Sequence, residues 1–142
     1  MPDPCISQGI YMWDYSDKVK DHFHNPRNVG EIEDPDGIAE VESMACGDAL
    51  KLTFRVDEHE RIIDARCKVA GCVSAIACAS ALTETIKGLT IEEAAKITDQ
   101  DIVDYLGGLP LGKTHASAMA QEALEKAVEG FKARVCSILP QR

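Results

Sequence analysis

Two stretches of alternating polarity constrain the fold of this chain more than any other feature of its sequence. Apolar residues take every second position over residues 50–56, and the same period of two returns over residues 63–69. Such alternation is typical of strands with one buried face. The polar run 57–60 between them is short enough to be a turn, and we expect a third strand over residues 39–43. Together they predict a small antiparallel sheet of about three strands.

The period changes to that of helices after Cys72. Four helices are expected in this part of the chain, over residues 72–86, 90–97, 99–106 and from 114 to beyond 131. A short helix, capped by Asp14 or Ser16 and ending near His24, comes before the sheet. Strands followed by helices predict an α+β fold with the helices packed on one sheet face. We expect a flexible tail over residues 1–12 and a single domain over residues 13–142.

Charge and polarity narrow the classes of function. The chain has 24 acidic and 15 basic residues and a net charge of -9, which disfavours nucleic-acid binding. An acidic surface suits a basic protein partner, although solubility alone also explains it. We find no signal peptide at the start and no apolar run long enough to span a membrane, so a reducing, cytoplasmic setting is expected. Cysteines in that setting more often bind metals, catalyse or lie buried than form disulfides.

The six cysteines fall into different classes. Cys67 is in phase with the buried face of the second strand, and Cys78 lies near the apolar stripe of a helix, so both are expected in the core. The two terminal cysteines have no partner motif. Cys46 lies in a break between strands and Cys72 at a junction of strand and helix, where functional groups are often presented. A helix N-terminus also favours the thiolate form of a cysteine such as Cys72.

Asp48 and His115 complete a candidate ligand set with Cys46 and Cys72. Two thiols, a carboxylate and an imidazole are what a thiophilic metal such as zinc or iron requires. The residues alone leave alternatives open, because Asp48 also suits a cap or turn and His115 also suits a surface or capping position. The sequence therefore predicts a metal site if these four residues converge.

One competing motif points to phosphate binding. Residues 107–114 match the pattern G-x-x-x-x-G-K-[ST] of a phosphate-binding loop. That loop follows a buried parallel strand, whereas residues 99–105 read as a capped helix, and no later strand is expected to supply a magnesium ligand. We therefore do not expect a nucleotide here.

Several segments together resemble the iron–sulfur cluster assembly scaffold family, both the IscU type and the amino-terminal domain of the NifU type. The matching segments share the order of that family and span roughly residues 13–133: they are 15–19, 21–30, 45–48, 71–77 and 106–110, the last leading to 113–115. The resemblance is more specific than any single motif, and it accounts for the Gly-Gly-Leu-Pro segment without a nucleotide.

The resemblance implies an α+β fold and a scaffold that is not an enzyme. Such scaffolds receive sulfur from a cysteine desulfurase, take iron, build a transient [2Fe–2S] cluster and deliver it to acceptor proteins. It implies that Cys46 and Cys72 hold the cluster, with Asp48 and His115 as variable or labilising ligands. Lys113 stands where the family has a lysine that can exchange with other ligands.

The chain departs from the family pattern at Ala116, where the family usually has a third cysteine. Alanine can neither bind iron nor carry sulfur. Ala116 is either a natural variation, in which His115 and Asp48 or another cysteine complete the ligand set, or an engineered substitution. Residues 109–113 also differ from the chaperone-recognition segment of some relatives, so an Hsp70 partner is not expected.

Two further questions concern the metal and the assembly. Because the ligand preferences of zinc and iron overlap, a zinc-binding protein or small zinc hydrolase is the alternative function, and zinc can occupy the site in purified protein. The short ligand set leaves room for a homo-oligomer that shares a cluster between copies.

Overall fold

The computed structural model describes residues 15–43, 47–109 and 115–138, so the predicted tail lies outside the described residues. The elements in chain order are α1 (Asp17–His24), β1 (Gly37–Ser43), β2 (Asp48–Val56), β3 (Ile62–Ala70), α2 (Val73–Ile86), α3 (Ile91–Ala94), α4 (Asp99–Tyr105) and α5 (His115–Ile138). The three strands form one antiparallel sheet in the order β1-β2-β3. The predicted α+β class and the three-stranded sheet are confirmed.

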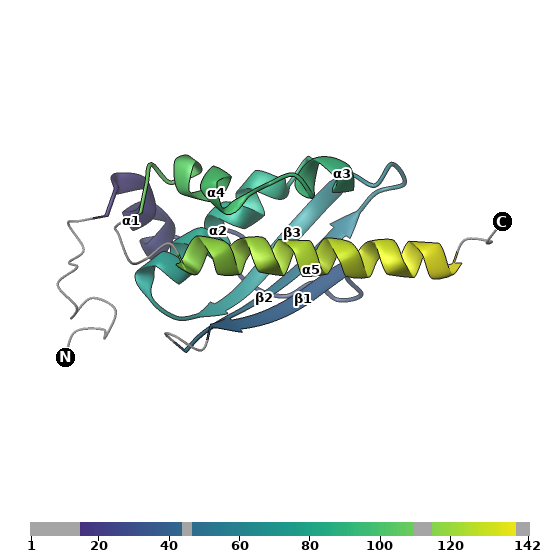
Figure 1. Cartoon of the computed structure of the whole chain (residues 1–142), viewed down its shortest axis with the longest axis horizontal. Helices are drawn as coiled ribbons and strands as arrows, with labels where there is room; N and C mark the ends of the chain where they lie inside the picture. The colour runs from purple at the N-terminus through teal and green to yellow at the C-terminus, as the bar shows by residue number, and fades with distance from the viewer. Residues whose placement is uncertain (1–14, 44–46, 110–114, 139–142) are drawn as a thin grey trace.

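The helices cover one face of this sheet, as predicted. The long helix α5 packs on β1 and β2, while α2 packs on β3 (Figure 1). Helix α2 is rich in small residues and is buried on nearly every side, because α1, α4 and α5 also contact it. The layer of helices brings the start of α5 close to the start of α2.

The register of the sheet decides which apolar side chains reach the core. Leu50, Leu52 and Phe54 of β2 are buried, as their alternation predicts. A register shift at Arg55 and Val56 then changes the phase of the paired strand, so that Ile62 is buried and Ile63 is 53% exposed. The expectation that Ile63 shares the buried face was therefore wrong, because an irregularity of one residue exchanges the two faces of a strand.

Side-chain caps define where three helices begin. Ser16 caps α1, and Thr90 forms the predicted capping box of α3, which ends at Ala94 and is shorter than expected. Helix α4 is capped by Thr98 and not by Asp99, which is already inside the helix. A threonine or serine hydroxyl accepts a backbone N–H that the first turn leaves unpaired.

Residues 25–36 connect α1 to β1 around the sheet. Val29 forms a parallel bridge with Cys67 at the free edge of β3. Further on, the backbone N–H of Ile32 donates to Thr53 Oγ1 at 3.2 Å on the face that the helices leave open. This segment therefore covers part of the outer sheet face.

His22 is buried, although the polar sequence around it predicts a solvated side chain. Its Nδ1 lies 2.7 Å from Ser80 Oγ of α2, and the same oxygen accepts the backbone N–H of Arg27 at 2.8 Å. A lone histidine in a polar helix gives no sign of this, because the burial comes from the packing of α1 on α2.

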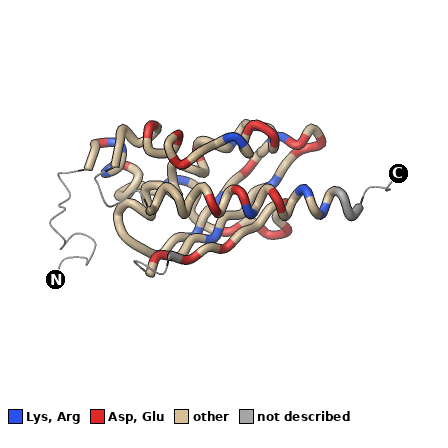
Figure 2. Tube along the Cα trace, in the orientation of Figure 1, with Lys and Arg blue, Asp and Glu red and all other residues tan. Residues whose placement is uncertain are grey.

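The acidic residues are spread over the surface. Figure 2 shows them along α5, on α4 and α3, and around the turn between β2 and β3. None of the described helices is both long enough and apolar enough to cross a membrane.

Candidate metal centre

Three of the predicted ligands converge at one end of the sheet. Asp48 is the first residue of β2, Cys72 is the N-cap of α2, and His115 is the first residue of α5. One carboxylate oxygen, the thiol sulfur and one ring nitrogen all lie within 4.8 Å of one another. Residues that are 24 and 43 positions apart in the chain thus meet because three elements begin at the same place.

Asp48 is the central member of this group, and its side chain is 1% exposed. Oδ1 accepts the backbone N–H of Cys72 at 3.1 Å, and Oδ2 lies 3.6 Å from the thiol of Cys72. Oδ2 is also 3.4 Å from Nε2 of His115. A buried carboxylate needs such partners to offset the loss of water. Asp48 therefore joins the two elements that carry the other ligands, and does not merely cap its own turn.

The thiol of Cys72 stands at the N-terminus of α2 beside the carboxylate of Asp48. The residue is 2% exposed, and its side chain makes no capping hydrogen bond to α2. Its sulfur lies instead beside Asp48. The positive end of the helix dipole favours negative charge at this position, which is the form in which cysteine binds metal.

His115 presents a buried nitrogen to the same point. Its side chain is 24% exposed, but Nε2 is buried and has no hydrogen-bond partner in the described part of the chain. The 3.4 Å approach to Asp48 therefore brings the atoms close without hydrogen-bond geometry. An unpaired buried nitrogen beside a carboxylate and a thiol fits a metal ligand.

A hollow borders the centre at His115. It is lined by Glu42, His115, Ala118, Met119 and Glu122, between the end of β1 and the first turns of α5. His115 is thus a member of the centre that also lines an open surface of the described structure.

Gly71 is a site residue that the sequence did not single out. It directly precedes Cys72, and the carboxylate of Asp48 occupies the space where a side chain at position 71 would begin. The one signal in the sequence is that a glycine stands directly before Cys72.

The other predicted site residues cannot be placed in the same way. Cys46 and Lys113 lie outside the described residues. Ala116 follows His115 on α5 and is fully buried.

The two cysteines predicted for the core are there. Cys67 and Cys78 are buried, and burial raises the pKa of Cys67 to about 11. Burial also raises the pKa of Cys78, with a smaller contribution from Cys72. Both thiols stay protonated near neutral pH, so neither is a ready metal ligand.

The phosphate-loop motif has the wrong structural context. Helix α4, and not a strand, leads into it. Gly107 and Gly108 have φ of 79° and 107° and end this helix, with the N–H of Gly108 donating to the carbonyl of Val103 at 2.9 Å. The glycine pair therefore acts as a helix terminator.

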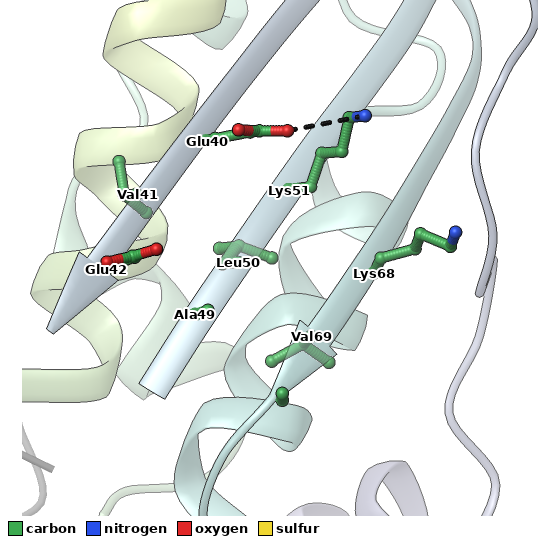
Figure 3. A pocket seen from close by; sticks show the side chains of 9 residues that line it. Glu40, Val41, Glu42, Ala49, Leu50, Lys51, Lys68 and Val69 are labelled. Carbon is green, nitrogen blue, oxygen red and sulfur yellow. Dashed lines mark ion pairs between the residues drawn. The ribbon is translucent and has the colours of Figure 1, made fainter. Parts of the chain in front are cut away.

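A second hollow lies on the outer face of the sheet (Figure 3). Its lining includes Ala49 and Ala70 as well as Lys51 and Lys68. Nζ of Lys51 is 3.0 Å from Glu31 and 3.4 Å from Glu40, so its charge is already paired. This hollow has no thiol or imidazole in its described lining, and the metal-binding chemistry stays at the end of the sheet.

Comparisons with known proteins show the family of this chain. Residues 14–137 match the family described as NifU-like N terminal domain. The nitrogen fixation protein NifU of Trichormus azollae is 53% identical over 128 residues, which cover 85% of this chain and 43% of that protein. The iron–sulfur cluster assembly scaffold protein IscU 1 of Archaeoglobus fulgidus is 50% identical over 117 residues, covering 82% of this chain and 76% of IscU 1. The chain thus spans less than half the length of the NifU relative.

A solved structure supports the fold. The crystal structure of a protein from Fervidobacterium islandicum, described as an iron–sulfur cluster assembly scaffold for the SUF system, matches with a TM-score of 0.68. The match covers 80% of this chain and 96% of that one, at 22% sequence identity. At that identity the likeness concerns the fold alone.

Proposed function

Since this chain belongs to the family of NifU-like N-terminal domains, we propose that it is a scaffold on which an iron–sulfur cluster is assembled and from which it is passed on. The observation that carries the proposal is the convergence of Asp48, Cys72 and His115 within 4.8 Å. The relatives whose names describe their role are scaffold proteins. The task of such a protein is to hold and transfer its cargo, and not to catalyse a reaction.

We further propose that the cargo is a [2Fe–2S] cluster, that its sulfur comes from a cysteine desulfurase, and that acceptor proteins receive it. Thiolates of Cys72 and Cys46 hold iron firmly, while the oxygen of Asp48 and the nitrogen of His115 hold it more weakly. Mixed ligation of this kind suits a cluster that must leave. Lys113 would serve as an exchanging ligand during that step. A net charge of -9 suits donors and acceptors with basic docking surfaces.

Ala116 sets a limit on how sulfur enters the centre. Its buried methyl group offers no ligand atom and no site for a persulfide. Of the positions that the family resemblance assigns to cysteine, only 46 and 72 carry a thiol here. Among these positions, incoming sulfur would therefore be accepted on Cys46 or Cys72, unless another cysteine of the chain takes the place of the missing one.

The centre does not suit a zinc hydrolase. Asp48 is the base that it would require, and Asp48 lies against both Cys72 and His115 as a ligand would. A hydrolytic centre needs a base that is not itself bound to the metal.

Anaerobic reconstitution with ferrous iron and sulfide tests the proposal. We expect a brown protein with visible absorption bands and the Mössbauer spectrum of a [2Fe–2S] centre, and we expect Cys72→Ser to remain nearly colourless. Cys67→Ser is the matched control, because it changes a buried thiol that lies in the core and not at the centre. Incubation with an apo-ferredoxin should then move the absorption to the acceptor.

Two results would count against the proposal. A folded protein that stays colourless under these conditions would exclude a cluster scaffold, whatever its zinc content. Equal cluster loading of the Cys72→Ser and unsubstituted proteins would exclude this centre as the place of assembly.

A further inference from the structure

Tyr15 and Ser16 contact α2, at whose start Cys72 stands, and the end of α4. They directly precede α1, and neither belongs to the centre defined by Asp48, Cys72 and His115. Each uses its hydroxyl to reach a different element. The contacts below show that this pair joins the start of α2 to the end of α4.

The hydroxyl of Ser16 makes two hydrogen bonds, one to α1 and one to the end of α4. Oγ accepts the backbone N–H of Val19 at 3.1 Å and so caps α1. The same group donates to the carbonyl of Leu106 at 2.5 Å. Leu106 is the fully buried C-cap of α4, and the connection to His115 begins directly after it.

Gly107 forms the turn beside which Ser16 lies. It follows Leu106 with a φ of 79°, and a Cβ at that position would lie 3.5 Å from Cβ of Ser16. The glycine therefore turns the chain out of α4 while Ser16 packs against the turn. Ser16 thus fixes the point from which the chain leaves toward α5.

Tyr15 contacts a ligand-bearing element, α2. Its ring is in the core, and its phenolic oxygen accepts a hydrogen bond from Ser74 Oγ at 3.4 Å. Ser74 is fully buried in the first turn of α2, two residues after Cys72. Tyr15 therefore contacts the turn that presents the thiol.

We propose that Tyr15 and Ser16 position Cys72 and His115 relative to one another, so that the affinity and geometry of the metal centre depend on this pair. The inference rests on the proposed function only in taking these ligands to bind a metal. Tyr15 and Ser16 are adjacent, and one peptide unit therefore couples the start of α2 to the start of the α4–α5 connection. Groups that orient ligands from outside the centre commonly change metal affinity.

Cobalt(II) is a suitable probe, because its visible bands report both thiolate ligation and coordination geometry. Ser16→Asp is the informative variant: aspartate still caps a helix, but its carboxylate cannot donate to the carbonyl of Leu106. Tyr15→Phe removes the hydroxyl that Ser74 contacts. We expect each variant to bind cobalt(II) about fivefold more weakly and to shift its ligand-field bands. Ser16→Thr, which keeps the hydroxyl, should have the cobalt(II) affinity and the ligand-field bands of the unsubstituted protein.

Thr90→Ala is the matched control. It removes the N-cap of α3, which is a cap of the same kind but contacts no ligand-bearing element through an observed hydrogen bond. We expect its melting temperature to fall, as in Ser16→Asp, while its cobalt(II) affinity and spectrum stay unchanged.

Three outcomes would overturn the inference. Unchanged cobalt(II) spectra and affinities in Ser16→Asp and Tyr15→Phe would do so, and so would an equal loss in Thr90→Ala, since the effect would then follow stability alone. The inference would also be wrong if the unsubstituted protein did not bind cobalt(II). Failure of cluster reconstitution, by contrast, overturns only the scaffold function, so the two proposals can be separated.

Discussion

The carboxylate of Asp48 occupies the space in which a side chain at position 71 would begin. A Cβ built on Gly71 would lie 2.2 Å from Oδ1 and 2.7 Å from Cγ of Asp48. No real Cβ approaches another atom so closely, and the buried carboxylate cannot move without leaving the N–H of Cys72. The lack of a side chain at Gly71 is thus a condition for the Asp48–Cys72 contact.

The first prediction concerns Gly71→Ala. The added methyl group should displace Asp48, lower the free energy of unfolding by about 1–3 kcal/mol and weaken metal binding. Urea denaturation and cobalt(II) titration measure the two effects. Gly130→Ala is the control, because a Cβ there meets nothing within 4 Å and the glycine lies inside α5. That change should stabilise the protein by about 0.5–1 kcal/mol. Normal cobalt(II) affinity in Gly71→Ala would contradict the prediction.

The second prediction concerns Ala116→Cys. A thiol at this buried position beside His115 adds a ligand to the centre, so the reconstituted cluster should survive longer against chelators and transfer more slowly. Ala116→Ser adds a group of similar size that is a poorer iron ligand, and its cluster should resemble that of the unsubstituted protein. The decay of visible absorbance after a chelator is added gives the comparison. Equal decay rates in all three proteins would show that a third cysteine has no role here.

The third prediction concerns metal removal. The three ligands come from β2, α2 and α5, so a bound ion joins elements that separate on unfolding. A metal that binds only the folded state stabilises it by about 2.7 kcal/mol at a hundredfold excess over the dissociation constant. We expect zinc(II) to raise the melting temperature and a chelator to reverse the change. Cys72→Ser should abolish the shift; an unaltered shift in that variant would place the bound ion elsewhere.

The fourth prediction concerns pH. Burial lowers the pKa of His22 below its usual 6.5, and the nearby charge of Arg27 lowers it further, while Glu84 and Asp21 oppose this and Lys18 adds a small effect. The unfolded chain therefore binds a proton more readily than the folded one. This contribution to stability is complete above pH 6.5 and is lost as the pH falls through the lower pKa of the folded state.

Urea unfolding at a series of pH values tests this effect. The free energy of unfolding should fall on going from neutral pH to about pH 5, and the fall should be smaller in His22→Asn. Asparagine is chosen because its amide oxygen can still accept a hydrogen bond from Ser80, the partner of Nδ1. Identical pH dependence in both proteins would show that His22 does not carry the effect.

The fifth prediction follows from the register shift between β2 and β3. Ile62→Ala should cost about 2–5 kcal/mol because it leaves a cavity in the core, whereas a change of the exposed Ile63 to Thr should alter stability by about 0.5 kcal/mol or less. Urea denaturation of the two variants distinguishes the buried from the exposed position. If the Ile63 variant lost more free energy of unfolding than the Ile62 variant, the position of the register shift would be wrong.

The register shift between β2 and β3 could not be predicted from the sequence. The alternation over residues 50–56 predicts β2 correctly, because each apolar side chain there faces a continuous helical layer. The alternation over residues 63–69 predicts β3 but assigns Ile63 to the wrong face, since a one-residue shift leaves no mark in polarity. His22 escapes prediction for a related reason: its burial depends on where α1 docks.

The types of ligand at the metal centre could be predicted from the sequence, but their convergence in space could not. The side chains of Cys72, Asp48 and His115 indicate a metal by their chemistry alone, whereas their convergence depends on how three elements pack and has no signature in the spacing of the residues. The contact of Asp48 with Cys72 depends on the missing side chain at Gly71, which no pattern of ligands reveals. Cys46 and Lys113 remain predictions.

The place of His115 at the very start of α5 has a consequence for release. The first turn of a helix opens at a small fraction of the free energy needed to unfold the domain. The side chain of His115 is 24% exposed, whereas Asp48 and Cys72 are almost fully buried, in β2 and at the start of α2. Fraying of one helical turn would therefore withdraw one ligand while the other two stay in place. The exit of a cargo would then require no hinge and no rearrangement of the sheet.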